Sequence, residues 1–185
     1  DYLELENLYA SFPNPCLADV KIGKQTFDPT ADEAKRKRRM AKWPPLQTLG
    51  YQFLGIQRGS DGKHLDRSWC RSLKLEEIFV AFSRFLPEPS QKQNQIELIH
   101  KIKNGFTQSI EEITNWTENQ TAIQLYATSL FLCYCNSTGR TKIKLIDFAH
   151  IFFEEGRRDE NFIDGIKNFT RDLNLACDRL VDGLK

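Results

Sequence analysis

An acid and a base lie two residues apart near the start of the chain. Asp19 and Lys21 belong to the segment PCLADVKIG at residues 15–23, whose pattern predicts a β-strand over 17–22 that ends at Gly23. Because successive side chains of a strand point to opposite faces, Asp19 and Lys21 share one face. A carboxylate beside an ammonium suits a site that accepts a hydroxyl proton and offsets phosphate charge, although surface ion pairs have the same spacing.

A dense basic run follows this strand. Six of the chain's 26 Lys and Arg residues lie in the eight positions 35–42. On an α-helix, Lys35, Arg38, Arg39 and Lys42 fall on one face. The compact charge of lysine and the planar fork of arginine both suit phosphate. The run therefore predicts a phosphate-binding face, with a solvated helix face and a nuclear-import signal as the alternatives.

A third candidate lies near the end of the chain, where an apolar strand over 142–147 ends in Asp147. Phe148 follows directly, and His150 lies three residues beyond the acid. Kinases present the carboxylate that holds Mg²⁺ against the phosphates of ATP in this way. The alternative is an aspartate that caps a turn at the end of a strand.

The elements that must position these side chains can be predicted from hydrophobic spacing and turn residues. Strands are expected at 2–8, 17–22, 50–57, 123–134 and 142–147, and helices at 30–42, 75–86, 96–113 and 162–176. Thr30 and Glu33 have the spacing of a capping box and predict the start of the basic helix. Strands at both ends with helices between them indicate an α+β lobe.

Composition limits the classes of function. The 185 residues carry a net charge of +1, so any anion site must arise from local clustering, and we expect no stable nucleic-acid partner. No apolar stretch is long enough to span a bilayer, and five cysteines without C-x-x-C spacing indicate neither a disulfide framework nor a zinc site. We expect a monomer in the cytoplasm, the nucleus or both.

Four motifs together resemble the inositol polyphosphate kinase family. The family's P-x-x-x-D-x-K-x-G motif is complete in segment 15–23, and its S-L-L strand is similar to Ser129-Leu130-Phe131. Its D-F-A-H element stands at 147–150, and its closing D-x-N-F-x-x-G-x-x-N-F pattern at 159–169. The motifs appear in the family's order over nearly the whole chain, and we identify the chain from them as a member of that family.

The resemblance implies a fold and a domain organisation. We expect the C-terminal lobe of a two-lobed kinase whose cleft is like that of protein kinases and ATP-grasp enzymes. Residues 1–8 would form the hinge and 9–185 the catalytic lobe, with the substrate-binding basic helix at about 30–43. Because the chain begins at the hinge, we expect the N-terminal lobe to be absent from it.

The resemblance also implies ATP and Mg²⁺ as cofactors and a role for each candidate residue. The backbone of Glu6 and Leu8 would pair with adenine. Asp19 would lie where the ribose and the attacking hydroxyl approach, and Asp147 would bind Mg²⁺ and ATP. Lys21 would stabilise the transferring phosphoryl group. The expected contacts to the inositol phosphate are Lys21, Lys35, Arg38, Arg39, Lys42 and His150.

Within the family, the short link from Gly23 to the basic helix and the segment Phe27-Asp28-Pro29 are most similar to the inositol polyphosphate multikinases. This branch implies inositol tris- and tetrakisphosphate substrates. Multikinases commonly carry glutamines where this chain has Arg38 and Arg39, so a hexakisphosphate kinase that makes pyrophosphates is the alternative. A non-catalytic anion-binding scaffold is a third reading. A protein kinase is disfavoured because the H-R-D loop is missing.

Overall fold

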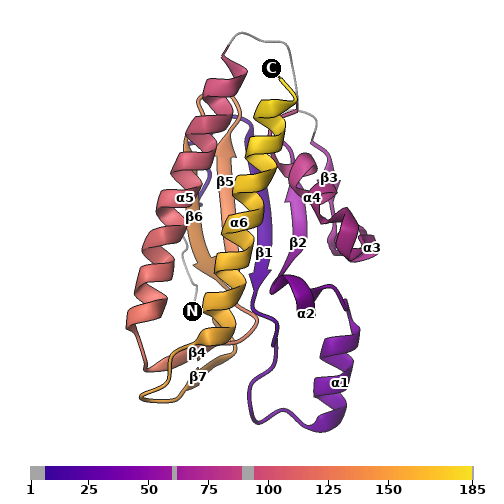
Figure 1. Cartoon of the computed structure of the whole chain (residues 1–185), viewed down its shortest axis with the longest axis vertical. Helices are drawn as coiled ribbons and strands as arrows, with labels where there is room; N and C mark the ends of the chain where they lie inside the picture. The colour runs from indigo at the N-terminus through magenta and orange to yellow at the C-terminus, as the bar shows by residue number, and fades with distance from the viewer. Residues whose placement is uncertain (1–6, 60–61, 89–93, 185) are drawn as a thin grey trace.

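The computed structural model describes residues 7–59, 62–88 and 94–184 (Figure 1). The strands are β1 (Pro15–Ile22), β2 (Tyr51–Gln57), β3 (His64–Leu65), β4 (Ile123–Leu125), β5 (Ser129–Cys135), β6 (Thr141–Ile146) and β7 (Ile151–Phe153). The helices are α1 (Glu33–Ala41), α2 (Leu46–Leu49), α3 (Arg67–Ser72), α4 (Ile78–Phe85), α5 (Gln95–Asn119) and α6 (Glu160–Asp182), with a 3₁₀ turn at Leu75–Glu77. The chain therefore has the α+β composition that the sequence predicts.

Five strands form one antiparallel sheet in the order β3-β2-β1-β5-β6. The long helices α5 and α6 lie side by side across one face of this sheet (Figure 1). The short strands β4 and β7 pair separately below the ends of β5 and β6 (Figure 1). In the described ranges, no helix is long and apolar enough to cross a membrane.

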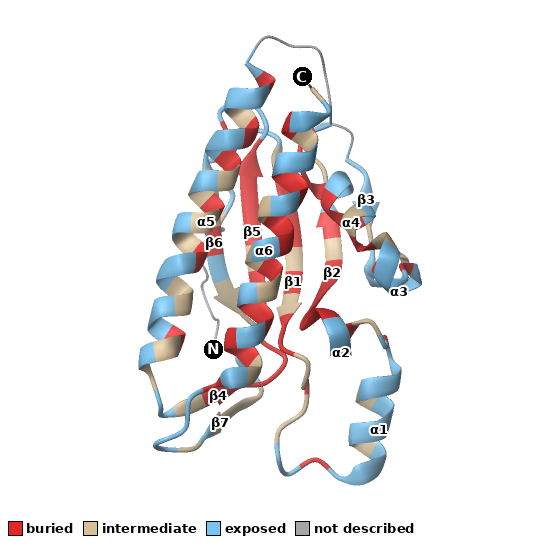
Figure 2. Cartoon of the chain, in the orientation of Figure 1, coloured by how far each residue is buried: buried red, intermediate tan, exposed pale blue. Residues whose placement is uncertain are grey.

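The alternation along β1 divides its residues between a core and a site. Ala18, Val20 and Ile22 are buried in the main apolar core beneath the helices. Strand β1 accordingly carries red and tan bands in Figure 2. Asp19 and Lys21 point to the opposite face, as the period of two requires. One strand therefore anchors the fold and presents the predicted acid and base together.

An aromatic cluster fixes β2 against α6. The rings of Tyr51, Phe53, Phe82 and Phe169 pack within 5.1–6.5 Å of one another, centroid to centroid. The Tyr51 hydroxyl donates a hydrogen bond of 2.7 Å to Asp172 Oδ2. Burial of the aromatic rings holds the sheet and α6 in one register, and the polar end of Tyr51 has a partner, as a buried hydroxyl requires.

Helix α1 projects from the body and has no buried residue (Figures 1 and 2). Its start differs from the prediction. Asp32 is the N-cap and accepts from Lys35 N at 2.6 Å, whereas the Thr30 hydroxyl is taken by the Asp28 carboxylate. The predicted capping box at Thr30 is therefore wrong, because a local hydrogen bond of Thr30 competes with helix capping.

The strand predicted over 123–134 is interrupted. Ala127 has a left-handed φ of 62°, so β4 leaves the main sheet and pairs with β7. The prediction of β6 as the partner of β5 is confirmed. Helix α3 was not predicted. Residues 1–6 lie outside the described residues, so the opening strand, the hinge residue Glu6 and the missing N-terminal lobe stay predictions, while Leu8 lies in a turn.

Candidate functional site

The strand register brings the ends of three strands together. Lys21 of β1 lies opposite Ser129 of β5, and Ser129 lies opposite Ile146 of β6. Asp147 follows Ile146 directly, so it lies at the same edge as Lys21. A β-bulge between Asp19 and Val20 interrupts the pairing of β1 with β2 beside this edge, a position where bulges often re-aim side chains next to a site.

Asp19 is a half-buried carboxyl held in an unfavourable environment. Desolvation raises its pKa, and the nearby Asp147 carboxylate raises it further. Ser129, Lys21 and Arg67 oppose this rise. Although Ser129 lies near the carboxyl, neither Asp19 Oδ1 nor Ser129 Oγ has a hydrogen-bond partner of ordinary geometry. A carboxylate with a raised pKa is a better proton acceptor than a solvated one.

The pKa of Lys21 is shifted downward, whereas that of Asp19 is shifted upward. Desolvation lowers its pKa, and the cations of Arg39 and Arg67 act in the same sense. The carboxylates of Asp19 and Asp147 partly offset this effect. All five charged groups are therefore close enough to influence one another, although they come from β1, α1, α3 and the end of β6. A convergence of charges that shifts the pKa of Asp19 and of Lys21 is typical of functional sites.

Asp147 lies in a strained turn at the end of β6. Its φ is 64°, its side chain is exposed, and its carbonyl accepts a long hydrogen bond of 3.4 Å from Thr128 Oγ1. In the described part of the chain, no three His, Cys, Asp or Glu side chains are placed to hold a metal ion. Asp147 with nearby Asp19 nevertheless fits Mg²⁺, which proteins commonly bind through one or two carboxylates together with substrate phosphates.

Buried polar atoms without partners gather at this site. Among the described residues, four buried side-chain atoms lack a hydrogen bond, namely Asp19 Oδ1, Gln52 Nε2, Arg71 Nε and Ser129 Oγ. Asp19 and Ser129 lie at the strand edge, and Gln52 lies opposite Lys21 on β2. Since an unpaired buried polar atom is unfavourable, their clustering indicates that a bound ligand supplies their hydrogen-bond partners.

A cationic pocket adjoins Lys21. Arg39 and Lys42 approach from α1, and Arg67 and Arg71 from α3. Gln52, Thr26, Trp43, Leu46 and Leu54 complete its lining. Partial desolvation lowers the pKa of Lys42, followed by repulsion from Arg39, Arg71, Arg38 and Arg67. The pocket therefore concentrates mutually repelling cations that an anion would stabilise.

The basic helix divides between two places. Arg39 and Lys42 line the pocket, whereas Arg38 is exposed and lies outside the pocket lining. Lys35 Nζ lies 3.8 Å from Asp28 Oδ2, and His150 Nδ1 lies 4.0 Å from the same oxygen. Asp28 therefore lies between α1 and the turn that carries Asp147.

The motif at residues 159–169, mostly on α6, holds the loop and the strand ends next to the site. Asn161 accepts from Gln25 N at 2.8 Å and donates to Gln25 O at 3.1 Å, which holds the loop between β1 and α1. A Cβ at Gly165 would overlap the backbone of Gly50 and Gly23, so α6 can approach the strand ends only with glycine there. This motif positions the loop and contributes no side chain to the cationic pocket.

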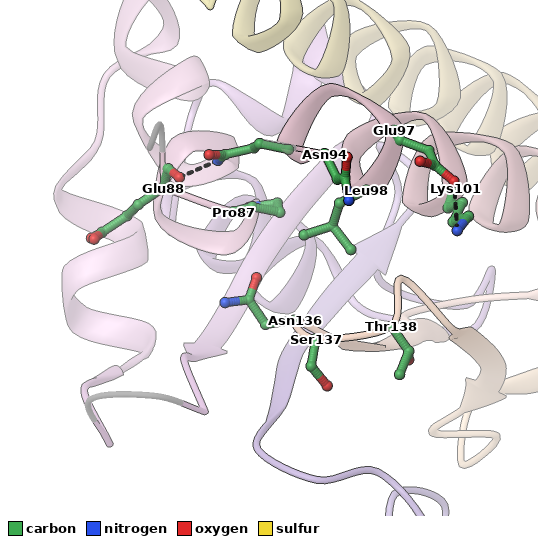
Figure 3. A pocket seen from close by; sticks show the side chains of 10 residues that line it. Pro87, Glu88, Asn94, Glu97, Leu98, Lys101, Asn136, Ser137 and Thr138 are labelled. Atoms are coloured by element: carbon green, nitrogen blue, oxygen red, sulfur yellow. Dashed lines mark hydrogen bonds and ion pairs between the residues drawn. The ribbon is translucent and has the colours of Figure 1, made fainter. Parts of the chain in front are cut away.

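A larger hollow of about 520 Å³ lies at the other end of β5, between the β5–β6 turn and the start of α5 (Figure 3). Its charged lining is mixed, with Glu88 and Glu97 beside Lys101, and Glu97 pairs with Lys101 at 2.9 Å. Among the described residues that line it, the positive excess of the smaller pocket is lacking. We therefore place the anion site at Lys21, where charge and unpaired polar atoms coincide.

Sequence reasoning missed Arg67, Arg71, Gln52 and Asp28. The two arginines are four residues apart behind Asp66, whose side chain accepts from Trp69 N at 2.9 Å as the cap of α3. An Asp cap followed by two basic residues at helical spacing was a usable signal. Gln52 carried no such signal, because its place in the site depends on its pairing with Lys21.

Comparison with known proteins finds relatives over nearly the whole chain. A family model described as inositol polyphosphate kinase matches residues 2–174. Inositol polyphosphate multikinase of Homo sapiens is 31% identical over 175 residues, which cover 91% of this chain and 41% of the human protein. Inositol polyphosphate multikinase alpha of Arabidopsis thaliana is 25% identical over 202 residues, which cover 96% of this chain and 71% of the plant protein. The chain thus spans less than half of the human relative.

Solved structures share the fold. An inositol phosphate multikinase superposes with a TM-score of 0.75 at 23% identity, covering 99% of this chain and 86% of the solved one. The multikinase Ipk2 of S. cerevisiae, solved with ADP and Mn²⁺, has a TM-score of 0.74 at 21% identity and covers 95% and 82%. At these identities the likeness establishes the mixed α and β fold alone.

Proposed function

This chain belongs to the inositol polyphosphate kinase family, and we propose that its site transfers the γ-phosphate of ATP to a hydroxyl of an inositol polyphosphate. One observation carries the proposal: the acid and base of β1 meet Asp147 at the edge of a pocket lined by five cations. Phosphoryl transfer depends mainly on positioning and charge neutralisation, which this arrangement supplies.

In the proposed reaction, the acceptor hydroxyl attacks the γ-phosphorus in line with the bond to ADP. The new oxygen–phosphorus bond forms as the bond to the ADP oxygen breaks, and the hydroxyl proton passes to Asp19. Desolvation raises the pKa of Asp19 and so supports this role. Lys21, beside it on the strand, offsets the charge on the transferring group.

ATP and Mg²⁺ are the proposed cofactors, and Asp147 is the proposed metal ligand. A bound Mg²⁺ would neutralise phosphate charge. The yeast relative solved with ADP and Mn²⁺ supports a nucleotide and a divalent metal as cofactors. For adenine, we propose pairing with the backbone of Glu6 and Leu8, of which Leu8 lies in the turn that precedes β1.

The proposed acceptors are inositol tris- and tetrakisphosphates, as in multikinases. The names of the human and plant relatives support this choice. An inositol hexakisphosphate kinase is the second candidate, because Arg39, Arg67 and Arg71 add cations to the pocket beyond the two lysines. A cationic pocket distinguishes acceptors by the density of their phosphate charge more than by the ring positions of the phosphates. Such a pocket suits several successive substrates.

The test uses the full-length protein with γ-labelled ATP and inositol tris-, tetrakis- and hexakisphosphate. We expect label on the tris- and tetrakisphosphates, reduced on the order of 10²-fold or more by Asp147→Asn. Glu111→Gln, which removes an exposed acid of α5, is the matched control and should act as wild type. Transfer to hexakisphosphate alone would select the second candidate. No transfer, or near-normal transfer by Asp147→Asn, would refute the assignment.

A further inference from the structure

A second pocket adjoins α3, between β2, β3 and α4, which lie together at one edge of the sheet (Figure 1). We call it the Trp69 pocket, and its volume is about 240 Å³, against about 60 Å³ for the cationic pocket. Of the described residues, none lines both pockets. Trp69 lines the larger one, whereas Arg67 and Arg71 of the same helix line the smaller one. Helix α3 is therefore a wall of two separate pockets.

One part of the Trp69 pocket is apolar. Ile56 of β2 pairs with Leu65 of β3, and both line the pocket together with Trp69 of α3. All three pack in or on the main apolar core, but Leu65 and Trp69 are only partly buried. A partly exposed indole beside two aliphatic side chains offers a flat ligand an apolar contact and a ring against which to stack.

The polar part of the lining carries an excess of positive charge. Arg58, Lys63 and Arg84 line the pocket together with one acid, Glu88. The Arg58 guanidinium donates to the Glu88 carboxylate and to two backbone carbonyls near the end of α4, at 3.0 and 3.2 Å. Arg58 and Glu88 therefore offset each other and form a fixed wall. The lining keeps a positive excess, to which the exposed Arg84 of α4 contributes.

The size and chemistry of the pocket indicate what it takes. One water occupies about 10–15 Å³ of such space, so a volume of about 240 Å³ admits on the order of twenty atoms of that size, as in an organic molecule of a few rings. Ligand pockets commonly combine apolar walls with a few polar groups that fix orientation. A polyphosphate suits this lining poorly, because its charges would lose water against an apolar wall.

We propose that the Trp69 pocket binds a small aromatic anion, with its ring against Trp69 and its negative charge at Arg84. The apolar wall matches the ring, and the positive excess matches the charge. This site is separate from the one that we assign to phosphoryl transfer, and the inference does not rest on that function.

The probe is 8-anilinonaphthalene-1-sulfonate, an aromatic anion that fluoresces when it binds apolar surface, titrated into the full-length protein. N-phenyl-1-naphthylamine, which has the same rings without the sulfonate, is the uncharged counterpart. We expect saturable binding of the sulfonate to the wild-type protein. The two probes together separate the contribution of the charge from that of the rings.

The first variant is Arg84→Glu, at an exposed position of α4. The dissociation constant of the sulfonate should rise about 5-fold or more, because a carboxylate replaces the cation that faces it. The uncharged probe should bind this variant as it binds wild type. Lys37→Glu makes the same change in net charge on α1, outside the pocket lining, and should leave the binding of both probes unchanged.

The second variant is Trp69→Leu, which removes the ring and keeps an apolar side chain. It should weaken the binding of both probes about 5-fold, because the stacking partner is lost. Thermal melts of the ligand-free protein establish whether this variant is folded. If it is not, Arg84→Glu alone decides, since its side chain is exposed.

Three results would overturn the inference. The first is a wild-type protein that shows no saturable binding of the sulfonate. The second is a sulfonate affinity that Arg84→Glu leaves unchanged. The third is a sulfonate affinity that falls when Arg39→Gln and Lys42→Gln are combined, because the probe would then occupy the cationic pocket.

Discussion

Replacing Asp19 with asparagine should stabilise the protein and greatly reduce its activity. The Oδ1 atom of Asp19 is buried without a hydrogen-bond partner, and desolvation followed by the Asp147 carboxylate raises the pKa of this side chain. The folded protein therefore tolerates this charge at a cost in stability. An asparagine side chain has nearly the same shape and no charge, so Asp19→Asn removes that cost but leaves no group to accept the hydroxyl proton.

The size of the effect follows from the unpaired atom. Leaving a buried polar atom without a partner costs about 1–3 kcal/mol, and more when the atom is charged. Relief of about 1 kcal/mol would raise the melting temperature of a protein of this size by about 2–4 °C. The rate of phosphoryl transfer should meanwhile fall by about 10²-fold or more, the usual contribution of a general base.

The gain in stability from Asp19→Asn should increase with pH. Because the folded-state pKa of Asp19 lies above its ordinary value of 3.8, ionised Asp19 destabilises the fold fully above the raised pKa. The cost declines as pH falls from the raised pKa toward 3.8, and it disappears below 3.8, where Asp19 is protonated in both states. The advantage of Asp19→Asn should therefore be largest at neutral pH and vanish below pH 3.8.

Asp159 provides the matched control. It is also buried with a pKa raised by desolvation, but its Oδ2 accepts from Leu125 N at 2.5 Å and its Oδ1 from Phe162 N at 3.0 Å. Asp159→Asn replaces one acceptor with a donor and should lower the unfolding free energy by about 1–3 kcal/mol. Thermal melts of both variants against pH make the comparison. If Asp19→Asn destabilises as Asp159→Asn does, or keeps wild-type activity, the reasoning fails.

Two further variants test the neighbouring parts of the site. Because desolvation followed by nearby cations lowers the pKa of Lys21, kcat/KM should fall as pH rises through a value below 10.5, and Lys21→Arg should remove that limb in a pH–rate profile. Gly165→Ala should lower the unfolding free energy by about 1–3 kcal/mol in chemical denaturation and raise the acceptor KM, because its Cβ would overlap the backbone of Gly50 and Gly23; unchanged stability would contradict that packing.

Local patterns predicted the parts of the site that lie within one element. The period of two in β1 predicted that Asp19 and Lys21 share a face, and helical spacing predicted a basic face on α1. The start of α1 was predicted wrongly, because Thr30 and Asp32 can both cap a helix and Asp28 engages Thr30. Which of these two residues caps α1 depends on the neighbouring side chain of Asp28 and not on the capping motif.

Parts of the site that need distant segments could not be predicted. Lys21 meets Asp147 only because β1 pairs with β5, a contact between segments more than a hundred residues apart. Gln52 faces Lys21 only because β1 pairs with β2, and the six residues of α3 are too few to show a clear apolar period, although its Asp cap and two arginines were a signal. The left-handed Ala127 that ends β4 also had no signal, because no glycine marks it.

The central claim is that the cationic pocket binds the phosphorylated acceptor while the nucleotide binds elsewhere. Steady-state kinetics of the full-length protein with Arg39→Gln and Lys42→Gln combined test it most directly, with Lys37→Gln as control because Lys37 pairs with Glu33 on the exposed side of α1. We predict a rise of about 10-fold or more in the KM for inositol tetrakisphosphate, smaller at high salt, with the KM for ATP nearly unchanged. Equal changes in both KM values, or no change in either, would contradict the account.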